Sequence, residues 1–419
     1  MQRKQILVLV VIAMLTPYLA AKATEKVLYR FTGGADGGSP SSSLVMDVAG
    51  NLYGTTGAGG DLTQCSGGGC GTVFELQPSG NGKSQEKVLY AFQGGSDGSF
   101  PDGNLVFDAG GNLYGTTSDG GTSTNCSTEG CGTVFELSPN SNGTWTKTVL
   151  YNFQNEPDGA FPAGLILDAT GSLFGTTPRG GSNGGTVYKL SPPKQHGGAW
   201  AEKVLYAFTC FGATPNPSLV VDEEGNLYGS YYNLDDQFCS GEGCGVVFQL
   251  KQANGTWTET DLYDFVGGGN GGQPAGGVIR DSKGNLYGTG AEGGNNFGIL
   301  FELRRSGTQW KESMPYNFCS RNNCADGSFP LAGLVMDGSG ALYGTTYWGG
   351  AGCTYCGVVF KLSRTSNGWE ETVLHSFRGG KYDGVGPSDS LILDGQGDLY
   401  GVAGSTYGDG AGIVFELTP

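Results

Sequence analysis

Cysteine is the residue type whose spacing in this chain most directly implies chemistry. Ten of the eleven cysteines form five close pairs: Cys65 and Cys70, Cys126 and Cys131, Cys239 and Cys244, Cys319 and Cys324, and Cys353 and Cys356. In an exported protein, pairs of this kind form local disulfides. Each bond closes so short a loop that it removes only about 2 kcal/mol of chain entropy. Each is therefore expected to stiffen one loop rather than join distant segments.

Zinc is the competing interpretation of the cysteines. Each pair supplies only two thiolates, and His196 and His375 lie elsewhere, so a tetrahedral site would need two pairs to cooperate. We therefore expect no metal at the cysteines. Cys210 is left over; it is either a buried thiol or a competitor for Cys239 or Cys244.

Aromatic residues gather in segments that depart from the rest of the chain. The stretch GSYYNLDDQFCSGEGCG (229–245) holds Tyr231, Tyr232 and Phe238, and a later stretch holds Tyr347, Trp348 and Tyr355. Flat apolar rings beside carboxylates suit stacking against sugars, which predicts ligand binding; packing beneath their own loops is the alternative. Asp235, Asp236 and Glu242 are the candidate catalytic residues if the protein is a glycoside hydrolase or polysaccharide lyase. Hydrolysis needs two carboxyls about 5–5.5 or 6.5–9.5 Å apart.

Two families of aspartates recur along the chain. The phrase D-G-x-x-P, with some variation, contributes Asp36, Asp97, Asp158, Asp326 and Asp383. Carboxylates on one face could hold calcium, but no copy has the dense alternating carboxylates of a calcium loop, so we favour a turn. The second family begins D-x-x-G turns at Asp47, Asp108, Asp168, Asp222, Asp281, Asp337 and Asp394. Turn chemistry accounts for these residues without a catalytic role.

These candidates sit between copies of a repeat. Leu-Tyr-Gly begins at Leu52, Leu113, Leu227, Leu286, Leu342 and Leu399, and Leu173-Phe174-Gly175 is the remaining copy. Around each copy, four short β-branched and aromatic segments recur, as in NLVFD, NLYGTT, GTVFEL and TVLYNF of residues 104–153. Seven units of four strands predict an all-β fold, a seven-bladed β-propeller with four antiparallel strands per blade. A β-solenoid is the alternative, but its turns repeat at shorter intervals.

The termini predict how the ring closes. The first segment, KVLYRF (26–31), matches a fourth strand, and the last unit lacks one. We expect residues 27–31 to pair with residues 412–417, so that the N-terminal strand completes the last blade. The segment ending in the D-x-x-G aspartate should lie innermost. Antiparallel succession then places the loops after the second and fourth strands on one face, here called the upper face, and these loops hold the cysteines.

Composition and the N-terminus indicate the compartment. Arg3 and Lys4 precede an apolar run and the pattern Ala21-Lys22-Ala23, which predicts a signal peptide (1–23) cleaved after Ala23 and a mature propeller domain (24–419). The remaining chain has no apolar stretch long enough to span a bilayer. A formal charge of −16 disfavours nucleic acid as a partner. The protein is expected to be secreted or periplasmic.

The phrases LYGTTSDGG (113–121) and GTVFELSP (132–139) resemble the choice-of-anchor tandem-repeat GloVer family of exported bacterial proteins. The resemblance covers residues 26–419 and implies export and a repeat fold; it supplies no catalytic residues. Nothing after GIVFELTP resembles a sorting tail.

The sequence therefore favours a non-enzymatic binding module whose ligand is a carbohydrate or an envelope protein. An extracellular hydrolase or lyase is the alternative, and a structural role in surface packing is a third hypothesis.

Overall fold

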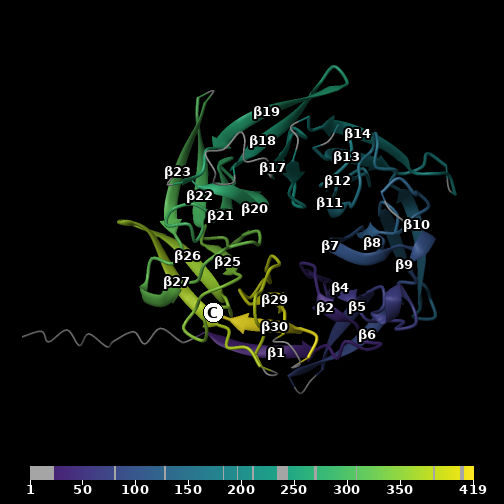
Figure 1. Ribbon diagram of the computed structural model, residues 1–419, viewed down its shortest axis with the longest axis horizontal. Helices are drawn as coiled ribbons and strands as arrows, with labels where there is room; N and C mark the ends of the chain where they lie inside the picture. The colour runs from purple at the N-terminus through teal and green to yellow at the C-terminus, as the bar shows by residue number, and fades with distance from the viewer. Residues whose placement is uncertain are drawn as a thin grey trace, which may run out of the picture.

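The computed structural model describes residues 23–79, 82–126, 129–182, 184–195, 197–209, 212–233, 244–268, 271–307, 309–380, 383–405 and 410–419. Seven antiparallel sheets stand around a common axis, each in the inner-to-outer order expected for a propeller blade (Figure 1). The predicted seven-bladed β-propeller is confirmed. Blades are numbered one to seven in chain order.

The strands of the first four blades run from the axis outward. Blade one contains β2 (Gly38–Pro40), β3 (Val45–Met46), β4 (Leu52–Ala58), β5 (Thr72–Ser79) and β6 (Lys83–Ala91); blade two contains β7 (Ser99–Phe107), β8 (Leu113–Asp119), β9 (Thr133–Pro139) and β10 (Trp145–Asn152). Blade three contains β11 (Ala163–Leu167), β12 (Leu173–Thr177), β13 (Thr186–Ser191) and β14 (Ala201–Ala207); blade four contains β15 (Ala213–Pro215), β16 (Val220–Val221), β17 (Leu227–Asn233), β18 (Cys244–Ala253) and β19 (Thr256–Phe265). In blades one and four the innermost strand is split in two.

The other three blades follow the same plan. Blade five contains β20 (Gly272–Arg280), β21 (Leu286–Glu292), β22 (Ile299–Ser306) and β23 (Gln309–Asn317); blade six contains β24 (Val335–Met336), β25 (Leu342–Thr346), β26 (Val358–Thr365) and β27 (Gly368–Ser376). Blade seven contains β28 (Ile392–Leu393), β29 (Leu399–Ala403), β30 (Ile413–Thr418) and β1 (Thr24–Arg30). Single 3₁₀ turns span Cys65–Gly67 (η1), Gly95–Asp97 (η2) and Asn322–Cys324 (η4).

The ring closes where the two chain ends meet. The N-terminal strand β1 lies antiparallel to the C-terminal strand β30, as predicted, and Figure 1 shows the purple strand beside the yellow one. Val27 lies opposite Phe415, and a bulge then places Tyr29 opposite Val414. The Phe31 N–H donates to the carbonyl of Gly412 at 3.0 Å, which extends the pairing past the strand end.

An aromatic pair packs across every blade junction. The phenylalanine that ends each outer strand meets an aromatic ring on the third strand of the next blade, with centroids 4.9–5.3 Å apart. The pairs are Phe31–Phe74, Phe92–Phe135, Phe153–Tyr188, Phe208–Phe248, Phe265–Phe301, Phe318–Phe360 and Phe377–Phe415. All of these rings are buried. Edge-on contacts at this distance add to the energy of apolar burial.

The same rings explain the glycine of Leu-Tyr-Gly. A Cβ at Gly115 would lie 2.6 Å from the Phe135 ring, and one at Gly54 would lie 2.7 Å from the Phe74 ring. Real side chains do not approach so closely, so the aromatic residue of the third strand requires glycine on the second. The two halves of the repeated phrase are therefore one packing unit.

The D-x-x-G aspartates are structural, as the turn interpretation predicted. Asp47 accepts hydrogen bonds from the backbone N–H groups of Ala49 and Asn51, from the Asn51 amide and from the Tyr53 hydroxyl. Partial burial opposes ionisation, but these donors outweigh it and hold the pKa of Asp47 below its ordinary value.

We predict that Phe92→Ala, which empties one junction, lowers the free energy of unfolding by about 3–5 kcal/mol because a fully buried ring leaves a cavity. Urea denaturation followed by tryptophan fluorescence measures the change. Phe100→Ala, at a ring that is 37% exposed, is the matched control and should stay within about 0.5 kcal/mol of the wild type. Equal losses in the two variants would contradict the role of the junction pair.

Candidate functional site

A cavity of about 420 Å³ opens at the upper end of the central axis. All seven blades contribute to its wall through residues that lie within their innermost strands or up to two residues before them: Ser43, Asn104, Ala163, Ser218, Gly276, Gly333 and Ser390. The predicted innermost position of these segments is confirmed. Side chains on this wall are mostly small because seven segments converge there, and the space they leave is the cavity.

Two carboxyl groups, on blades two and seven, face this cavity. Asp102 follows Pro101, and Asp389 lies two residues after Pro387, so both enter the wall just before an innermost segment. Enclosure by the channel wall raises the pKa of Asp102. The same desolvation, together with the charge of Asp102, raises the pKa of Asp389 to about 7. The two carboxyls therefore share one cavity, and enclosure raises the pKa of both.

The polar side chains of the cavity wall differ in whether their hydrogen bonds are already made within the protein. Asn104 holds blade three through both of its amide atoms, which pair with the backbone of Leu165. Asn216 donates to the Ser230 hydroxyl and to the carbonyl of Pro274, each at 2.8 Å. These two amides are thus committed to the wall, and Asp102 and Asp389 are the charged groups that line the cavity. No Lys or Arg is among the lining residues in the described part of the chain.

An aromatic surface lies on blades five and six. We call Phe297, Phe329, Tyr347, Trp348 and Tyr355 the aromatic platform; Trp348 is its centre, with ring centroids 4.7 Å from Phe329, 5.6 Å from Tyr355 and 5.9 Å from Tyr347. Tyr355 is 68% exposed and Tyr347 36% exposed. Leu331, two residues beyond Phe329, lines the cavity and is itself partly exposed. The chain that carries Phe329 therefore continues into the cavity wall at Leu331.

The platform is held by its backbone and by a disulfide. Tyr347 and Trp348 donate backbone N–H groups to Phe329 and Ser328. Cys353 and Cys356 are bonded and enclose Tyr355 in the loop between β25 and β26. The platform is thus a fixed surface, in which one exposed ring stands on a short closed loop.

Four of the five predicted disulfides are present: Cys65–Cys70, Cys126–Cys131, Cys319–Cys324 and Cys353–Cys356. Each lies in a loop after a second or fourth strand, as expected. Bonds of this kind indicate an oxidising, non-cytoplasmic compartment. Cys239 and Cys210 lie outside the described residues. Among the described residues, no helix is long and apolar enough to cross a membrane.

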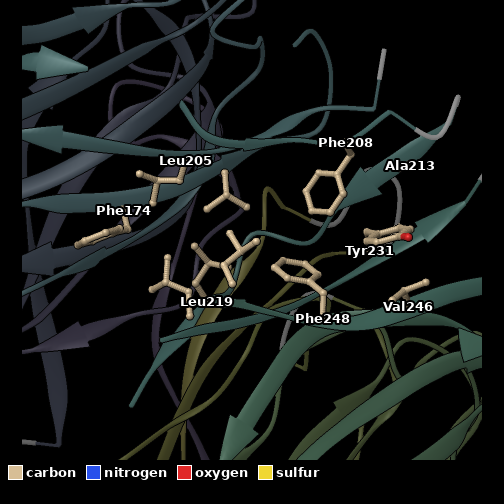
Figure 2. Packing of buried hydrophobic residues seen from close by; sticks show 11 residues of the cluster. Phe174, Leu205, Phe208, Ala213, Leu219, Tyr231, Val246 and Phe248 are labelled. Carbon is tan, nitrogen blue, oxygen red and sulfur yellow. The ribbon is translucent and has the colours of Figure 1, made fainter. Parts of the chain in front are cut away.

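The predicted ligand-binding aromatics fall into two groups. Tyr231 is 7% exposed and packs against Phe208 and Phe248 in the core between blades three and four, so its ring is not available to a ligand (Figure 2). Tyr232, the next residue, points the opposite way along β17 and lines the cavity. Asp235, Asp236, Phe238 and Glu242 lie outside the described residues.

The carboxylates Asp102 and Asp389 were missed because each copy of their segment differs. The only sequence signal was an acidic residue one or two positions after the proline of the D-G-x-x-P phrase, where the other five blades carry no acidic residue. The two positions can be assigned to one cavity only when the arrangement of the blades around the ring is known.

The D-G-x-x-P aspartates accept hydrogen bonds that hold the loop after an outer strand against that strand; we call each of them a fastener. Asp97 accepts hydrogen bonds from the Tyr90 hydroxyl and from the backbone N–H of Gln93, both at 2.8 Å. The same pattern of an outer-strand side chain and a backbone N–H occurs at Asp36, Asp158, Asp326 and Asp383. Each aspartate therefore ties the loop after an outer strand back to that strand, which supports the turn interpretation over a calcium ring.

A glutamate of the next blade approaches four of these aspartates across the junction: Asp36, Asp158, Asp326 and Asp383. Six outer strands carry a glutamate at this position, and in each at least one carboxylate oxygen is buried without a hydrogen-bond partner: Glu25, Glu86, Glu202, Glu259, Glu312 and Glu371. Burial, followed by the charge of Asp36, raises the pKa of Glu86 to about 7; burial and Asp158 do the same to Glu202. In the second blade the position holds Lys147, whose ammonium pairs with Asp97 at 2.8 Å.

Residues 237–419 match the Gloeobacter/Verrucomicrobia repeat, which confirms over that range the GloVer resemblance seen in the sequence. No curated protein matches the chain. Among solved structures, the fold is similar to polysaccharide lyase Uly1 (11% identity, 90% of this chain and 89% of that chain, TM-score 0.58). It is also similar to a PL25 ulvan lyase bound to -[GlcA(1-4)Rha3S]- (11%, 93% and 95%, TM-score 0.56) and to a puromycin hydrolase (13%, 88% and 51%, TM-score 0.54). At these identities the likeness shows the propeller fold alone.

We predict that the protein is most stable near pH 5 and loses stability as the pH rises toward 8. Glu86 and Glu202, whose pKa values are raised to about 7 in the folded state, keep protons that the unfolded chain releases above about pH 4.5. The free energy of unfolding therefore falls as the pH rises from about 4.5 through 7. The melting temperature between pH 5 and 8 measures this, and the double variant Glu86→Gln, Glu202→Gln should flatten the profile. Glu370→Gln, at an exposed position, should not. A wild-type melting temperature that rises over this interval would contradict the assignment.

Proposed function

We propose that this propeller binds an uncharged carbohydrate chain on its upper face. The observation that carries the proposal is an exposed aromatic platform whose chain continues, two residues beyond Phe329, into the wall of a cavity with two carboxyls. Sugar rings would stack on Trp348 and Tyr355, and hydroxyls of the terminal sugar would donate to Asp102 and Asp389. Rigid rings and a preformed cavity lose little entropy on binding.

Charge selects the class of carbohydrate. The cavity wall has two carboxyls and no lining Lys or Arg among the described residues, and the whole chain carries a formal charge of −16. A polyanionic chain such as a uronate or sulfated polysaccharide would be repelled by the carboxyls of the cavity and by the net negative charge of the protein. The proposed ligand is therefore neutral. Residues 1–23 would act as the export signal that delivers the protein to such a ligand outside the cytoplasm.

Asp389 favours a second candidate, hydrolysis at the same cavity. A carboxyl with a pKa of about 7 can donate a proton to a leaving oxygen, while a second carboxyl acts as base or nucleophile. Asp389 and Asp102 would fill these roles. A hydrolase would cleave the bound carbohydrate and release products, whereas a binding protein would leave it intact.

We predict that the mature protein binds neutral oligosaccharides on a glycan microarray and gives no signal with uronate-containing or sulfated ones. In calorimetry with the strongest neutral ligand, Trp348→Ala and Tyr355→Ala should each weaken affinity about tenfold, or about 1.4 kcal/mol, because each removes a stacking face. Phe100→Ala, an exposed ring of the same repeat position as Phe329, is the control and should bind like the wild type.

Unchanged affinity in the Trp348→Ala, Tyr355→Ala double variant, or binding confined to polyanions, would overturn the proposal. New reducing ends that accumulate with the wild type but not with Asp389→Asn would replace it with the hydrolytic role.

A further inference from the structure

One of the seven blade junctions has a different side chain at its fastener. Six outer strands carry tyrosine at the same repeat position, and four of these tyrosines donate to a D-G-x-x-P aspartate: Tyr29, Tyr90, Tyr151, Tyr206, Tyr263 and Tyr316 hold the position, and Tyr29, Tyr90, Tyr151 and Tyr316 make the bond. In blade six the same position is His375, on β27. This junction is also the one at which the N-terminal strand β1 packs next to blade six. The change therefore falls where the ring is closed.

Three ligand atoms from two blades converge at this junction. His375 Nε2 lies 3.0 Å from Asp383 Oδ1, and Glu25 reaches in from β1, so that one donor atom from each lies within 4.8 Å of the other two. Asp383 is oriented by the backbone N–H of Arg378, which donates to its second oxygen at 2.9 Å. Glu25 has a carboxylate oxygen that is buried and accepts no hydrogen bond.

The three groups match the preferences of a first-row divalent metal. One imidazole and two carboxylates form a nitrogen and oxygen set suited to zinc and its neighbours, whereas calcium takes six to eight oxygen ligands. When each bond is about 2.1 Å, ligands lie about 3.0 Å apart in a cis octahedral arrangement and about 3.4 Å apart in a tetrahedral one, so the 3.0 Å between His375 Nε2 and Asp383 Oδ1 requires little movement to bind a metal. At the other junctions the phenol of tyrosine replaces the imidazole, so the set is incomplete there.

We propose that Glu25, His375 and Asp383 form a binding site for a divalent transition metal, with water completing the coordination. The metal would join the N-terminal strand of blade seven to the outer strand and loop of blade six. Since β1 is tied to its own blade by strand pairing rather than by a connecting loop, a bound metal stabilises the closed ring through mass action.

The test is calorimetric titration of the chelator-treated mature protein with ZnCl₂ at pH 7, combined with melting temperature against free Zn²⁺. The wild type should bind one Zn²⁺ per chain at this site and gain thermal stability; CaCl₂ should give neither effect. His375→Tyr restores the residue of the other six blades, so it should fold normally and weaken zinc affinity by at least about tenfold. Glu25→Gln should weaken it similarly.

Glu86→Gln is the matched control, because it alters the same carboxylate position at a tyrosine junction and should leave zinc affinity unchanged. The converse variant Tyr29→His places an imidazole beside Asp36 and Glu86, and should raise the stoichiometry to two. His196, the other histidine of the chain, is unchanged throughout.

Zinc binding by His375→Tyr with wild-type affinity, or no zinc binding by the folded wild type, would overturn the proposal.

Discussion

The contact between two aromatic rings across each blade junction is the interaction on which this structure depends. A phenylalanine at the end of one blade's outer strand packs edge-on against a ring of the next blade's third strand, and a glycine on the second strand makes the space. Because the contact joins neighbouring blades, each copy must present both partners in the same place. That requirement explains why the phrases Leu-Tyr-Gly and Val-Phe-Glu-Leu recur with little change while the loops between them vary.

Ring closure follows from the same contact. Phe31 packs on Phe74 and Phe377 packs on Phe415, so the two junctions that flank blade seven are built like the other five. Once the ring is closed, the innermost segments meet around one axis, and the cavity with Asp102 and Asp389 exists only as a product of that convergence. The upper loops are then free to differ, and they carry the aromatic platform and the disulfides.

The repeat was sufficient to predict the fold, the closure strand, the inner strands and the disulfide-bearing face, because all of these follow from strand count and alternation. Side-chain direction in β17 was harder to predict. Tyr231 and Tyr232 are adjacent and chemically equal, and only the register of the strand decides that one is core and the other faces the cavity. Asp102 and Asp389 are far apart in sequence, and nothing local relates them. The junction glutamates were visible as a repeated residue, but their proximity to the aspartates of the preceding blade required the packing angle between blades.

Carbodiimide coupling of the unmodified protein tests ring closure most directly. Lys26 Nζ on β1 lies 2.7 Å from Glu416 Oε2 on β30, and both groups are accessible to reagent, so activation of the carboxylate should produce an amide between them. The account predicts that mass spectrometry of the monomer fraction detects a peptide from residues 24–30 joined to one from residues 413–419, and that the product disappears in denaturant. Its absence from the folded monomer, or its appearance only in covalent dimers, would contradict a ring fastened by its two chain ends.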